Sequence, residues 1–134
     1  MSVGIVIVSH SERLAEGVAE LARDMAQSGV MIAAAGGRED GGMGTSIEKV
    51  TAALQAVTSP DGILVLLDLG SAVMIAEMAI EALTEEEKRR TVISSAPLVE
   101  GAVLAALEAA SGSSLQEVVE AANEGVKMPK VRQE

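Results

Sequence analysis

The chain contains a single histidine, His10, which follows the apolar run Val3–Val8 and stands just before a polar stretch of helix-forming residues. Ser9 and Glu12 fit the S-x-x-E capping box, which would place His10 at the first position of a helix. Backbone N–H groups and the positive end of the helix dipole would then face the imidazole, an arrangement that suits an anion such as phosphate and favours the neutral, nucleophilic ring. The alternative is a surface histidine beside a serine cap.

A carboxylate, Asp68, comes directly after a second apolar run, Ile63–Leu67. In a parallel sheet of strand order 2-1-3-4, the strands that end at His10 and Asp68 are neighbours about 5 Å apart. An aspartate that accepts one ring N–H fixes the tautomer of a histidine and leaves the other nitrogen free to attack. The alternative is that Asp68 only caps a helix that starts at Ser71.

A glycine-rich stretch, GGREDGGMGTS, spans residues 36–46. Glycine allows backbone amides to approach an oxyanion closely, and Thr45 and Ser46 add hydroxyl donors at a helix start. The stretch is not a Walker A motif, because no Gly-Lys-Ser/Thr follows. A flexible connection is the alternative, and Thr45 with Glu48 also fits a capping box, so part of its chemistry is structural.

The residue inventory limits the chemistry further. There is no cysteine, which excludes disulfides, thiolate nucleophiles and cysteine-bound metals. There is also no tyrosine, and no lysine is expected near a strand-end loop, so a covalent carrier would be His10, a hydroxyl or a carboxylate. One histidine with scattered carboxylates supplies no recognisable metal-ligand set, and we predict neither a metal nor a cofactor.

The net charge of −10 argues against binding nucleic acid or an anionic membrane through a basic surface. The most apolar stretch, residues 62–80, is interrupted by Asp68 and Glu77 and is poorly suited to span a membrane. No basic segment precedes the first apolar run, as a secretory signal would require. We therefore expect a soluble, intracellular protein.

The elements that must position these residues alternate between short apolar runs and amphipathic stretches. The predicted strands are Val3–Val8, Val30–Ala35, Ile63–Leu67 and Thr91–Ser94. Helical spacing predicts helices through Leu14 to Met25, Ile47 to Val57, Ala72–Leu83, Leu98–Ala110 and Leu115–Ala122. This order predicts an α/β fold, an open, doubly wound, four-stranded parallel sheet of order 2-1-3-4 flanked by helices. Residues 1–122 would form the domain and residues 123–134 a frayed C-terminal tail.

The predicted helix Ala72–Leu83 is apolar on nearly every side, so it cannot bury a single stripe and expose the rest to water. It is either a central helix covered by other elements or the interface of a homodimer.

Four stretches occur in an order that resembles a known family: GIVIVSHSERLAEGV, AGGREDGGMGTS, DLGSA and APLVEGA. Together they resemble DhaM, the phosphotransferase-system subunit of dihydroxyacetone kinases that depend on phosphoenolpyruvate (PEP). The IIA component of mannose-family sugar transporters is similar more distantly. The resemblance covers about Val3 to Ala122, and DLGSA with PLVEGA favours the kinase subunit.

The resemblance implies a mannose-IIA-like fold and a cytoplasmic phosphocarrier, a homodimer that needs no cofactor or metal of its own. The family's phosphohistidine maps onto His10 and its neighbouring aspartate onto Asp68. Phosphate would come from the phosphocarrier protein HPr and pass to ADP on a separate nucleotide-binding subunit, while a third subunit binds dihydroxyacetone.

From the residues we expect Asp68 to occupy the Nδ1 side of His10, so that Nε2 carries the phosphoryl group. The expected phosphoryl-binding groups are those of Ser11, Gly44, Thr45, Ser46, Gly70 and Ser71. Two other functions remain open at this stage: a mannose-type IIA component that delivers phosphate to a IIB protein, and a regulatory module that only signals to a partner.

Overall fold

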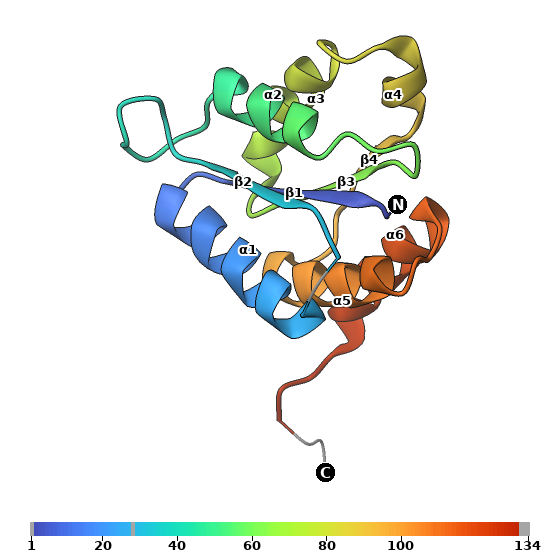
Figure 1. Ribbon diagram of the computed structural model, residues 1–134. Coiled ribbons are helices and arrows are strands. Elements are labelled where there is room, and N and C mark those ends of the chain that lie inside the picture. Colours follow the sequence, from blue (N-terminus) through green and yellow to red (C-terminus); the bar gives the residue numbers. More distant parts are fainter. Residues whose placement is uncertain (1, 28, 132–134) are drawn as a thin grey trace.

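A computed structural model of the chain describes residues 2–27 and 29–131 and places a parallel sheet between two layers of helices (Figure 1). The strands are β1 (Gly4–Ser9), β2 (Ile32–Gly36), β3 (Ile63–Leu67) and β4 (Thr91–Ile93), in the order β2-β1-β3-β4. All three strand pairs are parallel. The predicted α/β class, the doubly wound architecture and the strand order are confirmed.

One face of the sheet is covered by α1 (Glu12–Ala26), α5 (Leu98–Ala110) and α6 (Leu115–Asn123), and the other by α2 (Ile47–Ala56) and α3 (Val73–Ile80) (Figure 1). A short helix, α4 (Glu85–Arg89), precedes β4 on the same side as α2 and α3. Two 3-10 turns complete the fold: η1 (Gly70–Ala72), which leads into α3, and η2 (Glu124–Lys127), which follows α6.

The core has two halves because successive strand residues point to opposite faces of the sheet. Ile5, Ile7, Leu64 and Leu66 face the α1–α5 layer, whereas the residues between them face α2 and α3. β1 and β3 are buried along their whole length, as expected for central parallel strands covered on both sides. The helices meet the sheet mainly through alanines, which lets them approach it closely in a chain without aromatic residues.

Several predicted boundaries are wrong. The predicted helix Ala72–Leu83 ends at Ile80, and α4 follows it because Thr84 and Glu87 form a capping box that starts a new helix. Of α3, only Ala76 and Ala79 are buried, so this helix is not covered on all sides as the central-helix alternative required. Residues 124–127, predicted as part of a frayed tail, form η2, which packs against the start of α5. The domain boundary at residue 122 stays a prediction.

Gly36 ends β2 at a point where the strand nearly touches the start of α1. A Cβ atom added at Gly36 would lie 2.4 Å from the carbonyl oxygen of Ser11 and 2.8 Å from the Cβ of Ala15. Both neighbours belong to the segment that carries His10 into α1. The absence of a side chain at residue 36 therefore sets how closely this segment approaches the sheet edge.

We expect Gly36→Ala to lower the free energy of unfolding by about 1–3 kcal/mol, because the backbone of α1 must move away from β2. The matched control is Gly17→Ala in the middle of α1, where an added Cβ meets nothing within 4 Å. This control should instead gain up to about 1 kcal/mol from helix propensity. Urea unfolding followed by far-ultraviolet circular dichroism measures both, and equal effects of the two substitutions would contradict the close contact at Gly36.

Candidate functional site

His10 and Asp68 meet at the carboxyl edge of the sheet. β1 and β3 are paired so that Val8 lies opposite Leu67. Asp68 follows Leu67 directly, and His10 follows Val8 by two residues, after Ser9. The imidazole Nδ1 of His10 lies 3.0 Å from Oδ1 of Asp68. The imidazole side chain is 27% exposed and the carboxylate 12% exposed, so the pair is shielded but open to a group arriving from solvent.

Asp68 is held in place by a set of hydrogen bonds from its surroundings. Its Oδ2 accepts from the Ser9 hydroxyl and from the backbone N–H of His10, both at 3.0 Å. Its Oδ1 accepts from the backbone N–H of Leu69 at 2.7 Å, in addition to the contact with the ring. Asp68 caps no helix: the residue that precedes η1 is Leu69, and this turn has no side-chain cap. The alternative of a purely capping aspartate is wrong.

These contacts set the charge of Asp68 and the tautomer of His10. Partial burial alone would raise the pKa of Asp68, but the hydrogen bonds from the His10 backbone and ring, the Ser9 hydroxyl and Leu69 outweigh burial and hold the pKa below its ordinary value. An ionised carboxylate can only accept, so a neutral imidazole carries its proton on Nδ1 and has a lone pair on Nε2. The Ser71 hydroxyl lies 2.9 Å from Nε2 and donates to it in this tautomer.

The predicted capping box at Ser9 is wrong. α1 begins at Glu12, and its cap is Ser11, whose hydroxyl accepts from the backbone N–H of Leu14. Ser9 is instead fully buried, and its hydroxyl accepts from the backbone N–H of Ser11 at 3.0 Å while donating to Asp68. His10 therefore lies before the cap, and its own N–H is used by Asp68 rather than presented to a ligand.

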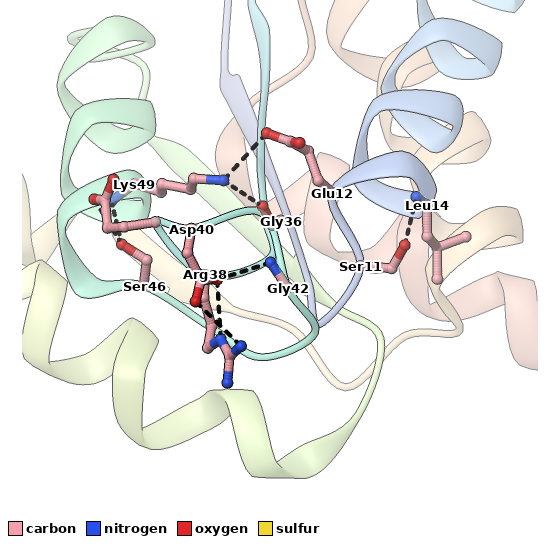
Figure 2. A network of polar contacts seen from close by, with 10 residues as sticks. Ser11, Glu12, Leu14, Gly36, Arg38, Asp40, Gly42, Ser46 and Lys49 are labelled. Atoms are coloured by element: carbon pink, nitrogen blue, oxygen red, sulfur yellow. Dashed lines mark hydrogen bonds and ion pairs between the residues drawn. The ribbon is translucent and has the colours of Figure 1, made fainter.

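The glycine-rich loop fastens the backbone around His10. The backbone N–H of Gly44 donates to the carbonyl of His10 at 2.8 Å, and that of Gly37 donates to the carbonyl of Ser9 at 3.2 Å. The turn of the loop is closed by Asp40, which binds the guanidinium of Arg38 and the backbone N–H of Gly42 (Figure 2).

This arrangement changes what the predicted phosphoryl-binding residues can do. The backbone N–H groups of Ser11 and Gly44 are already bonded within the protein. Ser46, not Thr45, caps α2, and its hydroxyl also donates to Glu39, so the predicted capping box at Thr45 is wrong. Thr45 has no side-chain hydrogen bond within the part of the chain that the structure describes.

Gly70 and Ser71 differ from the loop residues. They open η1, where the first backbone N–H groups of a helical turn have no partner within the turn. No acceptor for either N–H lies within residues 2–27 and 29–131. The Ser71 hydroxyl contacts Nε2, so this turn begins beside the imidazole.

Lys49 was missed by the sequence analysis, which placed no lysine near a strand-end loop. Its Nζ donates to the carbonyl of Gly36 at 2.9 Å and to Oε2 of Glu12 at 3.1 Å, and so joins α2, the end of β2 and the start of α1 (Figure 2). Side chains on a helix lean toward its N-terminus, which is how a residue in the first turn of α2 reaches back to the strand end. This side-chain direction, applied to the predicted helix that starts at Ile47, would have indicated that Lys49 can contact the end of β2.

The described residues include neither a metal-ligand cluster nor a membrane-spanning helix. Residues 2–27 and 29–131 contain no group of three or more His, Cys, Asp or Glu side chains that could hold a metal ion. Within the same residues no helix is both long enough and apolar enough to cross a membrane.

Comparison with known proteins gives the class of this fold and site. Residues 4–122 match the family model EIIA-man, described as the PTS system fructose IIA component. The chain is 32% identical to a protein of unknown function, EF1359, whose crystal structure superposes with a TM-score of 0.79 over 92% of this chain and 94% of that one. The protein thus belongs to the IIA components of the phosphotransferase system (PTS).

Two curated relatives narrow the assignment. The phosphoryl donor subunit DhaM of the PEP-dependent dihydroxyacetone kinase from Escherichia coli is 45% identical over 120 residues, which are 87% of this chain but 25% of that protein. The corresponding subunit of kinase 2 from Listeria innocua is 36% identical over 118 residues, 88% of this chain and 94% of that protein. The chain spans about a quarter of the former and nearly all of the latter. It belongs to the DhaM family.

We expect Asp68→Ala to lower the free energy of unfolding by about 1–3 kcal/mol at pH 7, because it leaves the buried Ser9 hydroxyl and two backbone N–H groups without their acceptor. Since folding lowers the pKa of Asp68, its contribution is present above the pKa of the unfolded chain and is lost as the pH falls through the folded pKa. The difference between the two proteins should therefore shrink below about pH 4.

Denaturant unfolding of both proteins at pH 7 and at several acidic pH values measures this difference. The matched control is Asp40→Ala, which removes an exposed carboxylate from the glycine-rich loop and should change the stability much less. A difference that stays constant down to pH 3 would show that Asp68 stabilises the fold without its charge.

Proposed function

We propose that this protein is a phosphohistidine carrier that accepts a phosphoryl group from HPr on Nε2 of His10 and passes it to ADP on the nucleotide-binding subunit of a dihydroxyacetone kinase. The observation that carries the proposal is the orientation of the partly exposed imidazole. Asp68 contacts Nδ1, and among the described residues the Ser71 hydroxyl alone makes a hydrogen bond to Nε2. The curated DhaM relatives, named as phosphoryl donor subunits, support the kinase over a mannose-type transporter as the destination.

The first step is the attack of the Nε2 lone pair on the phosphorus of the donor's phosphohistidine. The bond from His10 to phosphorus forms as the bond from phosphorus to the donor nitrogen breaks, and the electron pair of the broken bond returns to the donor imidazole. Positive charge develops on the ring of His10, and the ionised Asp68 against Nδ1 stabilises it. The second step repeats the exchange with a terminal phosphate oxygen of ADP as the nucleophile, and His10 returns to its neutral form.

The phosphoryl oxygens are held on the η1 side of the ring. The Ser71 hydroxyl turns from Nε2 to an oxygen of the incoming group, and the backbone N–H groups of Gly70 and Ser71 supply further donors. Ser11, Gly44 and Ser46 act indirectly, since their predicted donors bind other atoms of the protein. Thr45 follows Gly44 in the loop that fastens His10, and its hydroxyl, which has no hydrogen bond among the described residues, stays a predicted donor to the phosphoryl oxygens. The site uses neither a metal nor a cofactor, and the relay operates in the cytoplasm, where HPr and ADP meet it.

We further propose that the chain works as a homodimer that meets through α3. The outer side of this helix exposes Met74 to 70% and Met78 to 50%, and Leu69 just before η1 is exposed to 61%. Large apolar side chains exposed so close together on one element are typical of an interface. A two-fold axis beside α3 would bury the same surface on both subunits.

The relay is tested by incubating the protein with enzyme I, HPr and labelled phosphoenolpyruvate. The wild-type chain should take up acid-labile label, and His10→Ala should take up none, because no other side chain of the site replaces Nε2. Asp68→Asn should still be labelled but more slowly, by about 10²- to 10⁴-fold, since the charge that stabilises the developing imidazolium is gone. Normal labelling of His10→Ala would overturn the assignment.

The destination of the phosphate is tested by omitting the partners one at a time. Addition of the nucleotide-binding and dihydroxyacetone-binding subunits with dihydroxyacetone should discharge the labelled protein and form dihydroxyacetone phosphate. Discharge to a IIB protein of a mannose-type transporter instead would contradict the kinase assignment. Failure to discharge at a useful rate to either would favour a regulatory module.

The homodimer is tested by sedimentation at micromolar concentration. The wild-type chain should sediment as a dimer, and the double substitution Met74→Glu with Met78→Glu should sediment as a folded monomer, because it places charge in the interface. The matched control is Met25→Glu on α1, which changes a methionine of similar exposure on the opposite layer and should leave the dimer intact. A monomeric wild-type chain would remove the proposal.

A further inference from the structure

A cavity of about 310 Å³ opens at the carboxyl ends of β3 and β4, beside the His10–Asp68 pair. Its walls come from the end of β3 with η1, from the first residue of α3, and from the segment that joins β4 to α5. Asp68 lines this cavity and also binds His10, so the cavity and the imidazole share one side chain. The proposed mechanism uses Asp68 and the N–H of Gly70 at the edge of this space but assigns no role to the walls formed by β4 and the segment before α5.

The lining of the cavity is more apolar than polar and includes no lysine, arginine or histidine. Leu67, Val73, Ile93 and Leu98 supply the walls, and Asp68 is the single charged residue among those that line it. Asp68 is ionised, because its pKa lies below the ordinary value. A nucleotide or a phosphorylated substrate would bring its negative charge against this carboxylate with no cation to offset it. Both oxygens of Asp68 already accept hydrogen bonds from Ser9, His10 and Leu69, so the carboxylate does not require a cation in the cavity. The apolar walls therefore suit an uncharged, apolar group.

The cavity is also preformed on the side of β4. The Ser94 hydroxyl accepts from the backbone N–H of Ala96 at 3.0 Å and contacts Oδ1 of Asn123 at 3.4 Å, which fixes the turn that carries Ser95 and Pro97. Ser94 and Ala96 are buried, whereas Ser95 is exposed at the mouth. A preformed apolar recess needs no rearrangement when a side chain enters it, and such recesses hold the anchor residues of protein interfaces.

The chemistry of the first transfer step indicates what enters. A histidine side chain is short, so a donor that carries its phosphate on histidine must bring its backbone close to Nε2 of His10. A stable interface covers about 800 Å² on each partner, and a footprint of that size centred on His10 includes a cavity that shares Asp68 with it. The acceptor step differs, because a bound nucleotide stands between the two proteins.

We propose that this cavity is the docking recess for an apolar side chain of the phosphohistidine-bearing donor protein, carried next to the donor's own phosphohistidine. The inference rests on the proposed function and adds the contact by which the donor is recognised. The recess orients the donor so that its phosphorus meets Nε2, and it acts through binding rather than through the reacting atoms.

The proposal is tested by a substitution at the opening of the recess that blocks it. Ser95→Trp places an indole in the cavity or across its opening, and either position excludes the donor's side chain. The chain has no aromatic residue of its own, so the emission of this single tryptophan reports directly whether the ring is buried. We expect the KM for phosphorylated HPr to rise by about tenfold or more, with little change in kcat.

Three controls separate this result from other causes. Ser95→Ala removes the same hydroxyl without filling the recess and should leave the KM unchanged. Ser111→Trp carries the same indole at the far end of α5, roughly 20 Å away along the helix, and should behave as wild type. Phosphoramidate, a small phosphoryl donor that does not need the recess, should label His10 at the same rate in all four proteins.

The outcomes separate the two hypotheses. A wild-type chain that neither donor labels at His10 would contradict the proposed function and the inference with it. A normal wild type together with an unchanged KM for Ser95→Trp would overturn the recess alone, as would a Ser95→Trp variant that phosphoramidate also fails to label.

Discussion

The hydrogen bond between Asp68 and the Nδ1 of His10 is the interaction on which the rest of the site depends. Neither residue could supply it alone: it exists because β1 and β3 are adjacent and in a register that ends both strands at the same edge. Once the carboxylate holds Nδ1, Nε2 is the ring nitrogen left with a lone pair, and the Ser71 hydroxyl contacts it. Strand order is thus the source of the imidazole's orientation.

The groups around His10 also explain why a phosphoryl group on it would be passed on. The ring contacts a carboxylate and a hydroxyl, while Lys49 is bound to Glu12 and to the carbonyl of Gly36, and Arg38 of the glycine-rich loop is bound to Asp40. A phosphoryl group bound as tightly as its transition state would be released slowly. In the proposed mechanism the group meets neutral donors, whose hydrogen bonds are weaker than those of a lysine or an arginine, so the loaded state is not overstabilised.

The sequence predicted the parts of this site that follow from topology. Alternating strands and helices gave the strand order, and the strand order brought His10 and Asp68 together. The prediction was wrong where two serines could each cap α1. Ser9 fits the S-x-x-E pattern, but the cap is Ser11. The contact of Ser9 with Asp68, which is distant in sequence, decides between the two serines. The same ambiguity arose between Thr45 and Ser46.

Other parts could not be derived from local patterns at all. A glycine-rich stretch can either bind phosphate through its backbone amides or hold a neighbouring segment in place. Here the N–H groups of Gly37 and Gly44 donate to the carbonyls of Ser9 and His10, because the loop folds back over the start of α1. The hydrogen bond from Lys49 to the carbonyl of Gly36 depends on how α2 packs against β2. The spacing of residues in the sequence does not predict this packing. To predict which polar groups of a site can bind a ligand, it is therefore necessary to know which of them already have hydrogen-bond partners in the protein.

The backbone of His10 is held at both ends, and this shapes how transfer must occur. Its N–H donates to Asp68 and its carbonyl accepts from Gly44, so the residue is fixed from the β3 side and from the glycine-rich loop at once. As the proposed nucleophile, a histidine held this firmly cannot move toward its donor, so the donor would have to be brought to it in the correct orientation. Such a site gains speed from preorganisation and relies on the surrounding surface for alignment. The apolar recess that shares Asp68 with the ring lies where that alignment is needed.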